Sequence, residues 1–366
     1  MRLKRIHKFT KAVAKGLLPT QQATLSQMVC GVLFCRSLIL AQIARGFQTE
    51  VAFPHNLKRV ERYVSNPRIN SLQCKQVIAR RLLRQLHHRL QLNPAQPLEI
   101  IIDWTSVWPY QVLAALVPVA GRAVPVLQWA IARDQLKAQQ NIFEMEFIAA
   151  LRRCLPKHSK VVIVADRGFQ RAAFLQYLDA QGFGYVIRVK GDACVETSGY
   201  SGKLRDYPLQ VGQCFKLSKV TYHKTKRYEL KVVLNCERRD DKVCSWMLAT
   251  NLGLTARQTV AIYARRFWCE ESFRDQKQEF ELEGVRVKQA ARLENLLLVL
   301  AIALLMVAVI GMRGNKLACA KKFSPRKKQR VLLSWAQIAL NLLRESSKFL
   351  DLLFESRDTG FCFRWA

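Results

Sequence analysis

The spacing of apolar residues changes once, sharply, along the chain. From residue 1 to 92, apolar positions recur at helical spacing, for example in residues 24–34 and 55–64, and a longer helix is predicted for residues 72–92. The proline-containing segment 93–97 interrupts this pattern. The sequence therefore predicts a separate helical domain at the N-terminus.

After residue 97, short apolar runs bounded by turn residues predict strands that alternate with helices. Strands with continuous apolar sequence are typical of a sheet buried on both faces, so the fold class is α/β. The predicted elements are a strand at 98–102, a hairpin of 111–120 and 123–132, a helix at 141–155, a strand at 160–165, a helix at 171–180 and a strand at 183–189.

The later part of the chain changes character again. Residues 191–245 are rich in polar β-formers and predict a small, mostly antiparallel insertion before a helix at 255–280. The α/β core then consists of residues 98–190 and 246–312. Residues 313–366 contribute a cationic segment at 321–330 and an amphipathic helix at 335–354.

Residues 296–312 form a run of 17 uncharged, mostly apolar residues. This length is at the lower limit for crossing a bilayer, but a helix buried inside a protein is also apolar all round. Because no other segment has a membrane-like composition, we expect a core helix and no membrane association. A basic membrane-associated protein is the alternative.

The chain carries 59 Lys and Arg against 27 Asp and Glu, a formal net charge of +32. Such an excess predicts a polyanionic partner, and nucleic acid is the first candidate. The short basic helices of residues 1–92 are compatible with a helix-turn-helix-like DNA-binding domain. The 11 cysteines form no Cys-x2-Cys pair, which argues against a zinc site or a disulfide framework and favours a reducing cytoplasm.

Two apolar runs are each followed by an aspartate, Asp103 and Asp166. If the two strands are parallel neighbours, these carboxylates converge at one edge of the sheet, where α/β proteins bind ligands. Carboxylate oxygens without nearby His or Cys favour Mg²⁺ or Mn²⁺ over zinc. For each aspartate alone, a turn or a strand-end cap is the simpler interpretation.

Residues 263–277 contain no Gly or Pro and predict a helix. At ~100° per residue, Tyr263, Arg266, Glu270 and Lys277 fall within a strip of roughly 60°. Adjacent Glu271 lies outside this strip. A carboxylate among cations and a phenol can bind a metal ion and phosphates together, although ordinary surface ion pairs explain the same spacing.

These residues resemble the DDE transposases of bacterial cut-and-paste insertion sequences, in the subgroup with a Tyr-x2-Arg-x3-Glu-x6-Lys signature. Tyr263, Arg266, Glu270 and Lys277 match every spacing of that signature. The stretches around Asp103 and Asp166 resemble the two aspartate blocks of the family. A third stretch, 246–252, resembles its Trp-x-Leu-x-Thr strand.

The resemblance implies an RNase H-like mixed-sheet core with an inserted β subdomain, an all-α DNA-binding domain before it and a helical region after it. It implies that Asp103, Asp166 and Glu270 hold two Mg²⁺ ions, for which Mn²⁺ can substitute. Tyr263, Arg266 and Lys277 are then expected to bind DNA phosphates. By the same resemblance Trp246 stacks on a flipped base, and a Trp in the strand core is the alternative.

The function implied is that of a transposase. It binds the terminal inverted repeats of its own insertion sequence and catalyses Mg²⁺-dependent cleavage and strand transfer into target DNA. The expected partners are double-stranded DNA, as transposon ends and as target, and a second copy of the chain in a synaptic homodimer. The expected location is the bacterial cytoplasm, with the nucleoid. The alternative is a catalytically inactive relative that only occupies transposon ends.

Overall fold

A ten-stranded mixed sheet forms the centre of the described part of the chain, which comprises residues 2–90, 96–137, 139–155, 159–225, 227–239, 242–316 and 334–354 of a computed structural model. The strand order is β3-β2-β1-β4-β5-β10-β9-β8-β6-β7. The strands are β1 (Leu98–Val107), β2 (Tyr110–Val119), β3 (Arg122–Ala132), β4 (Val161–Ala165), β5 (Gly184–Arg188), β6 (Cys194–Thr197), β7 (Tyr200–Lys203), β8 (Cys214–Tyr222), β9 (Tyr228–Arg239) and β10 (Lys242–Thr250).

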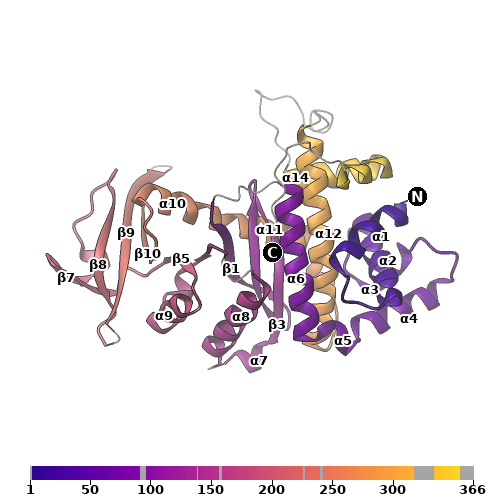
Figure 1. Cartoon of the computed structure of the whole chain (residues 1–366), viewed down its shortest axis with the longest axis horizontal. Helices are drawn as coiled ribbons and strands as arrows, with labels where there is room; N and C mark the ends of the chain where they lie inside the picture. The colour runs from indigo at the N-terminus through magenta and orange to yellow at the C-terminus, as the bar shows by residue number, and fades with distance from the viewer. Residues whose placement is uncertain are drawn as a thin grey trace.

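Helices cover the faces of the sheet and gather beyond its β3 end, whereas β7 and β8 lie at the opposite end (Figure 1). Those before the sheet are α1 (Arg2–Val13), α2 (Pro19–Cys35), α3 (Leu40–Arg45), α4 (Phe53–Val64), α5 (Pro67–Asn70) and α6 (Leu72–Leu90). Those after β3 are α7 (Arg133–Leu136), α8 (Gln140–Cys154), α9 (Ala172–Ala180), α10 (Ala256–Ala264), α11 (Trp268–Gln278), α12 (Ala290–Lys316) and α14 (Trp335–Glu345).

The predicted mixed α/β architecture is therefore confirmed in outline, and it is compatible with an RNase H-like core. Strands β1, β4 and β5 are parallel, whereas β10 joins β5 antiparallel and links the strands of 191–250 to the same sheet. The β-rich segment thus extends the central sheet. Strand β10 pairs with β5 on one side and with β9 on the other, and β9 pairs in turn with β8.

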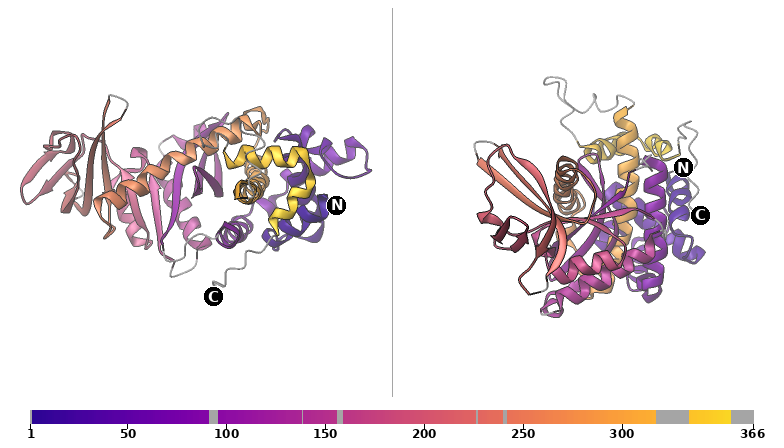
Figure 2. Two further views of the ribbon diagram at one scale, coloured as in Figure 1. Left: turned by 90° about the horizontal axis from the view of Figure 1, so that it is seen from above. Right: turned by 60° about the vertical axis from the view of Figure 1, so that its left-hand side comes forward.

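Strand β1 and the helix predicted at 255–280 differ from the sequence prediction. Strand β1 does not end at residue 102 but continues to Val107. The reason is that β2 pairs with it antiparallel from Ile101 to Val107. The helix predicted at 255–280 is divided by a 3₁₀ turn, Arg265–Phe267, between α10 and α11. Figure 2 shows α10 and α11 following one another across the sheet.

Each face of the central strands is covered by a different hydrophobic cluster. Alternate residues of β4 contribute Val162 and Val164 to the cluster beneath α10 and α11. Ile163 and Ala165 contribute to the large cluster on the opposite face. All five residues of β4 are buried, which explains why its sequence is apolar without alternation.

Helix α12 contains the uncharged run 296–312, whose length is compatible with a membrane span. It is long and apolar enough to cross a bilayer, but 89% of its most apolar window is buried inside the protein. It packs against α14, β3 and α2, and Figure 1 shows it between the sheet and the N-terminal helices. The Asn295 amide donates to the backbone oxygen of Val64, 2.9 Å away. These contacts agree with the expected core helix.

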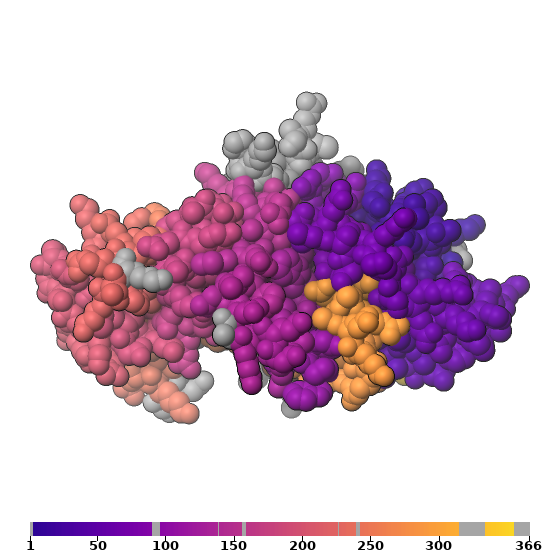
Figure 3. Space-filling view, turned by 90° about the horizontal axis from the view of Figure 1, so that it is seen from below, coloured from indigo at the N-terminus to yellow at the C-terminus, as the bar shows by residue number. Residues whose placement is uncertain are grey.

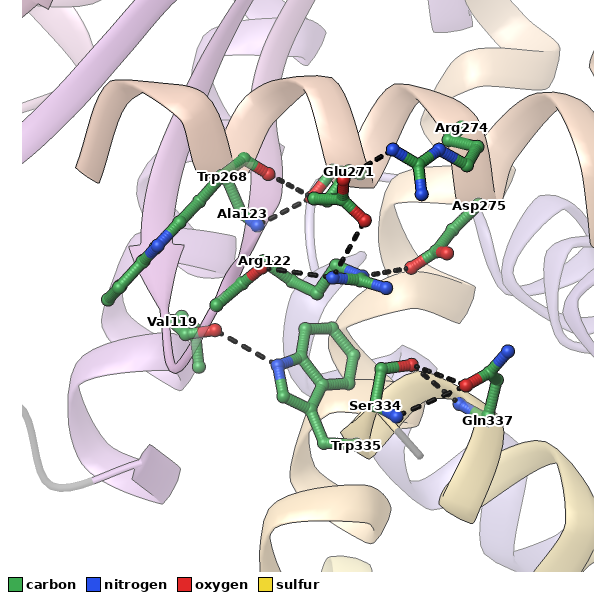
Figure 4. A network of polar contacts seen from close by, with 12 residues as sticks. Val119, Arg122, Ala123, Trp268, Glu271, Arg274, Asp275, Ser334, Trp335 and Gln337 are labelled. Carbon is green, nitrogen blue, oxygen red and sulfur yellow. Dashed lines mark hydrogen bonds and ion pairs between the residues drawn. The ribbon is translucent and has the colours of Figure 1, made fainter. Parts of the chain in front are cut away.

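The C-terminal part lies against α12 and the β2–β3 turn. Trp335 donates its indole N–H to the backbone oxygen of Val119 over 2.9 Å (Figure 4). The helix predicted at 335–354 ends at Glu345 and continues as a 3₁₀ segment, Ser347–Leu353. The cationic segment predicted at 321–330 lies outside the described residues.

The crossing of α12 and α14 predicts a strong cost for a small substitution. A Cβ at Gly311 would overlap the backbone oxygen of Trp335, whereas a Cβ at Gly314 would meet the flexible end of Leu342. We expect Gly311→Ala to lower the free energy of unfolding by about 1–3 kcal/mol despite its better helix propensity. Gly314→Ala should change it by less than ~1 kcal/mol. Equal urea unfolding midpoints for the two variants would contradict this packing.

Candidate active site

Asp103 lies in β1, and Asp166 directly follows the neighbouring strand β4. The parallel ladder of β1 and β4 pairs Ile102 with Ala165, and each aspartate is the next residue in its strand direction. Because side chains in register point to the same face, both carboxylates lie on the side of α10 and α11. Asp166 also accepts a hydrogen bond from the backbone N–H of Gly168 at 2.8 Å, which fixes the turn after β4.

Two consecutive arginines connect the helices to β1. Arg265 forms a two-bond ion pair with Glu99, and the next residue, Arg266, contacts Asp103 at 3.2 Å. Glu99 and Asp103 are four residues apart and therefore on the same face of the strand. The 3₁₀ turn at Arg265–Phe267 allows two adjacent side chains to reach this one strand.

Arg266 also forms an ion pair with Glu270, one helical turn later. Its guanidinium thus bridges Glu270 and Asp103, and Arg266 itself is only 7% exposed. Burial alone lowers the pKa of Arg266, but the surrounding Tyr263, Cys269, Asp103 and Glu270 raise it well above its usual value. Arg266 is therefore a permanent cation at the centre of the site.

The environment of Asp103 opposes its charge. Burial raises the pKa of the Asp103 carboxyl, the nearby Asp166 adds to this increase, and a hydrogen bond from Cys269 together with Arg266 lowers it. The Cys269 thiol donates to Asp103 Oδ2 at 3.2 Å. Asp166, which directly follows the neighbouring strand, is thus one of the groups that disfavour the charged form of Asp103.

The other residues of the signature, Tyr263 and Lys277, lie in different surroundings. Tyr263 is buried in the cluster beneath the helix, and burial raises the pKa of its hydroxyl. Lys277 forms an ion pair with Glu283 at 3.2 Å. The projection assumed one uninterrupted α-helix, and the 3₁₀ turn changes the angular phase between Tyr263 and the residues after it.

Trp246 is 6% exposed and packs against Tyr263 and Phe267, with ring centroids 5.1 Å and 5.9 Å away. A Trp that stacks on a flipped base needs an exposed face. Its position in this structure therefore favours the alternative of a Trp in the strand core. Through Tyr263 and Phe267 it supports the turn that carries Arg266.

Glu270 and Glu271 point to different partners. Glu270 joins Arg266 on the side of Asp103, whereas Glu271 contacts Arg122 at 3.2 Å on the β2–β3 turn. Figure 4 shows Arg122 between Glu271 and Asp275, with Asp275 Oδ2 2.8 Å from Arg122 Nε. The second glutamate thus anchors the start of α11 to the sheet.

Sequence reasoning missed a buried carboxylate, Glu144 of α8. It is 1% exposed and accepts hydrogen bonds from the Trp104 indole at 2.9 Å, from Gln140 at 2.8 Å and from Arg171. Arg171 also donates to the backbone oxygen of Gly168 in the turn after Asp166. Glu144 therefore links two segments. Through Trp104 it contacts β1 one residue after Asp103, and through Arg171 it contacts the turn that follows Asp166. The one sequence signal for this role is that Glu144 falls on the apolar face of the helix predicted at 141–155.

The donor types suit a hard divalent cation, since Asp103, Asp166 and Glu270 offer only oxygen. Their arrangement is not that of a closed metal site. Within the described residues, no three Asp, Glu, His or Cys side chains are grouped closely enough to hold a metal ion. The Arg266 guanidinium takes the place of a cation between Asp103 and Glu270.

Comparison with known proteins supports one class of protein. The family model described as "Transposase DDE domain" matches residues 133–306. The match includes Asp166 and Glu270, while Asp103 lies before it. No match was found among curated proteins. The family match supports a DDE transposase, a nucleic-acid-processing enzyme, and it agrees with the mixed sheet flanked by helices.

The buried position of Glu144 predicts a large stability loss on truncation. Glu144→Ala leaves the Trp104 indole without its acceptor and removes the negative partner of Arg171, and it should cost about 2–4 kcal/mol of unfolding free energy. Glu144→Gln keeps one acceptor and should cost less. Glu146→Ala, at an exposed position of the same helix, is the control and should be near neutral in urea unfolding. A neutral Glu144→Ala would refute the role of this network.

Proposed function

We propose that the protein is a DDE transposase that binds the terminal inverted repeats of its own insertion sequence and catalyses Mg²⁺-dependent strand cleavage and strand transfer. One observation supports this most strongly. Asp103 and Asp166 directly follow the last pair of a parallel ladder, Ile102 with Ala165, and Arg266 links the helix that carries Glu270 to Asp103. The family match over 133–306 supports the same conclusion.

In this proposal Asp103, Asp166 and Glu270 hold two Mg²⁺ ions, and Mn²⁺ can replace them. When bound, the ions activate a water or a 3′-hydroxyl and stabilise the leaving oxygen. The protein's own residues prepare the site. Cys269 and the backbone N–H of Trp104 orient the Asp103 carboxylate, and the turn after β4 orients Asp166.

Arg266 has two tasks in this scheme. In the protein without DNA it neutralises Asp103 and Glu270, which keeps the helix against the sheet. As a buried, always charged side chain it is also suited to bind a DNA phosphate beside the reacting one. Lys277 can bind a phosphate by exchanging its ion pair with the exposed Glu283, and Tyr263 supports Arg266 from the core.

The domain organisation follows the same proposal. Residues 1–92 bind DNA, 98–190 and 246–312 form the RNase H-like catalytic core, 191–245 form the β-rich insertion, and 313–366 complete the C-terminal region. The net charge of +32 supports DNA as the partner. We propose that two copies cleave both ends in a synaptic homodimer, in the bacterial cytoplasm.

A second candidate is an inactive relative that only occupies transposon ends. The bridge of Arg266 between Asp103 and Glu270 favours it, because the guanidinium lies where a metal ion would neutralise the same carboxylates. The two candidates make opposite predictions for cleavage.

The decisive variant is Glu270→Gln. It keeps the size of the side chain but removes the charge that a divalent ion needs, so cleavage of DNA carrying the inverted repeats that flank the gene should fall at least ~100-fold in Mg²⁺. End binding should remain within about twofold of the unchanged protein. Strand nicking on labelled DNA and gel-shift titration measure the two properties.

The matched control is Glu271→Gln, because Glu271 is adjacent but contacts Arg122 and Arg274 instead of Arg266. Cleavage should survive in this variant. Full cleavage by Glu270→Gln would remove Glu270 from the site. Absence of cleavage in the unchanged protein, with end binding intact, would favour the inactive relative.

Binding by the N-terminal domain should depend steeply on salt. Each neutralised phosphate contributes a slope of roughly −0.9 in log K against log salt. Lys58 is exposed on α4, and Lys58→Gln should make the slope shallower by about one unit in anisotropy titrations between ~50 and ~200 mM salt. Glu61→Gln, on the same helix, should not. An unchanged slope for Lys58→Gln would place the DNA on another face.

A further inference from the structure

Glu144 is a buried carboxylate that takes no part in the proposed metal chemistry. It lies in α8, and its side chain is 1% exposed. The magenta surface at the centre of Figure 3 includes α8 and α9, and the side chain of Glu144 lies beneath it. Burying a carboxylate costs free energy unless its partners compensate, so the partners of Glu144 indicate what the charge is for.

One carboxylate oxygen of Glu144 faces β1. Its Oε1 accepts the indole N–H of Trp104 at 2.9 Å. Successive side chains of a strand point to opposite faces, so the Trp104 indole reaches α8 while Asp103 faces α10 and α11. The backbone N–H of the same Trp104 donates to Asp103 Oδ1 at 2.8 Å. Holding the indole therefore also holds the peptide group that orients the Asp103 carboxylate.

The other carboxylate oxygen faces the turn after β4. Glu144 Oε2 forms an ion pair with Arg171, and the Arg171 guanidinium also donates to the backbone oxygen of Gly168 at 2.7 Å. The backbone N–H of Gly168 in turn donates to Asp166 Oδ1 at 2.8 Å. A Cβ at Gly168 would lie only 2.9 Å from that oxygen, so the turn fits closely around the Asp166 carboxylate.

Glu144 thus stands in the middle of a chain of contacts that runs from one aspartate to the other behind the sheet. The parallel ladder of β1 and β4 fixes how the two backbones lie, but not the angle of each carboxylate. Backbone N–H groups set that angle, and Glu144 holds the segments that carry them. Partners that orient metal ligands in this way typically change metal affinity by ~10–100-fold.

We propose that Glu144 is a positioning residue for the divalent-metal site. Through Trp104 and Arg171 it orients Asp103 and Asp166 so that both carboxylates can bind one ion, and it touches neither the ion nor DNA itself. This inference rests on the proposed function, because it requires Asp103 and Asp166 to be metal ligands. It gives Glu144 a role in metal affinity that is separate from its role in stability.

Thermal unfolding of the full-length protein in a Mn²⁺ titration tests the proposal without DNA. An ion that binds only the folded protein raises Tm with its concentration. Each variant is compared with itself in EDTA, so its own loss of stability cancels. We expect Glu144→Ala to weaken Mn²⁺ binding at least ~tenfold, and Glu144→Gln, which keeps one acceptor, to weaken it about threefold.

Two further variants break the chain at either end and keep the test valid if Glu144→Ala does not fold. Trp104→Phe removes the indole N–H, and Arg171→Gln removes the cation. Each should weaken Mn²⁺ binding by about three- to tenfold. Gly311→Ala, which is expected to lose stability at the distant crossing of α12 and α14, is the control and should bind Mn²⁺ within about twofold of the unchanged protein.

Glu270→Gln should abolish the Mn²⁺-dependent rise in Tm, which confirms where the ion binds. Equal Mn²⁺ affinities in the unchanged protein, Glu144→Ala, Trp104→Phe and Arg171→Gln would overturn the inference and leave the proposed function intact. A loss in Gly311→Ala as large as that in Glu144→Ala would also overturn it, because general destabilisation would then explain both. No rise in the unchanged protein, or a rise that survives Glu270→Gln, would contradict the inference and the proposed metal site together.

Discussion

The parallel pairing of β1 with β4 is the constraint on which the rest of the site depends. It sets Asp103 and Asp166 side by side at the point where the ladder ends. Parallel neighbours cannot be joined by a tight turn, so the chain between them must form a crossover. Here that crossover contains β2, β3, α7 and α8, and it brings Glu144 behind the same two strands.

Electrostatics then decide how the helices meet the sheet. The chain has an excess of 32 positive charges, yet several of its few carboxylates gather where α10, α11 and β1 meet. Two adjacent arginines, Arg265 and Arg266, pair with Glu99 and Asp103 and fix the turn between the helices. The same guanidinium holds Glu270 to Asp103. One buried cation, Arg266, thus holds α11 and β1 together at the candidate site.

Sequence periodicity identified the α/β class and most of the elements around the site. It failed at the two places where partners outside the segment decide the conformation. β1 runs past Asp103 because β2 pairs with it, and the helix at 263–277 is interrupted where consecutive arginines reach β1. Neither event leaves a local signal. Glu144 was missed for the same reason, since its donors come from β1, α8 and the segment after β4.

By itself, the sequence determined the basic character of the protein, the alternation of strands and helices, the two aspartates after apolar runs and the spacing from Tyr263 to Lys277. These are properties of composition and local order, which need no knowledge of neighbours. Only the tertiary structure decided that Trp246 and Tyr263 are buried, that Arg266 bridges two carboxylates and that Glu144 lies buried behind the two aspartates. Burial and ion pairing depend on which distant segments meet, and that is settled by the packing of the whole chain.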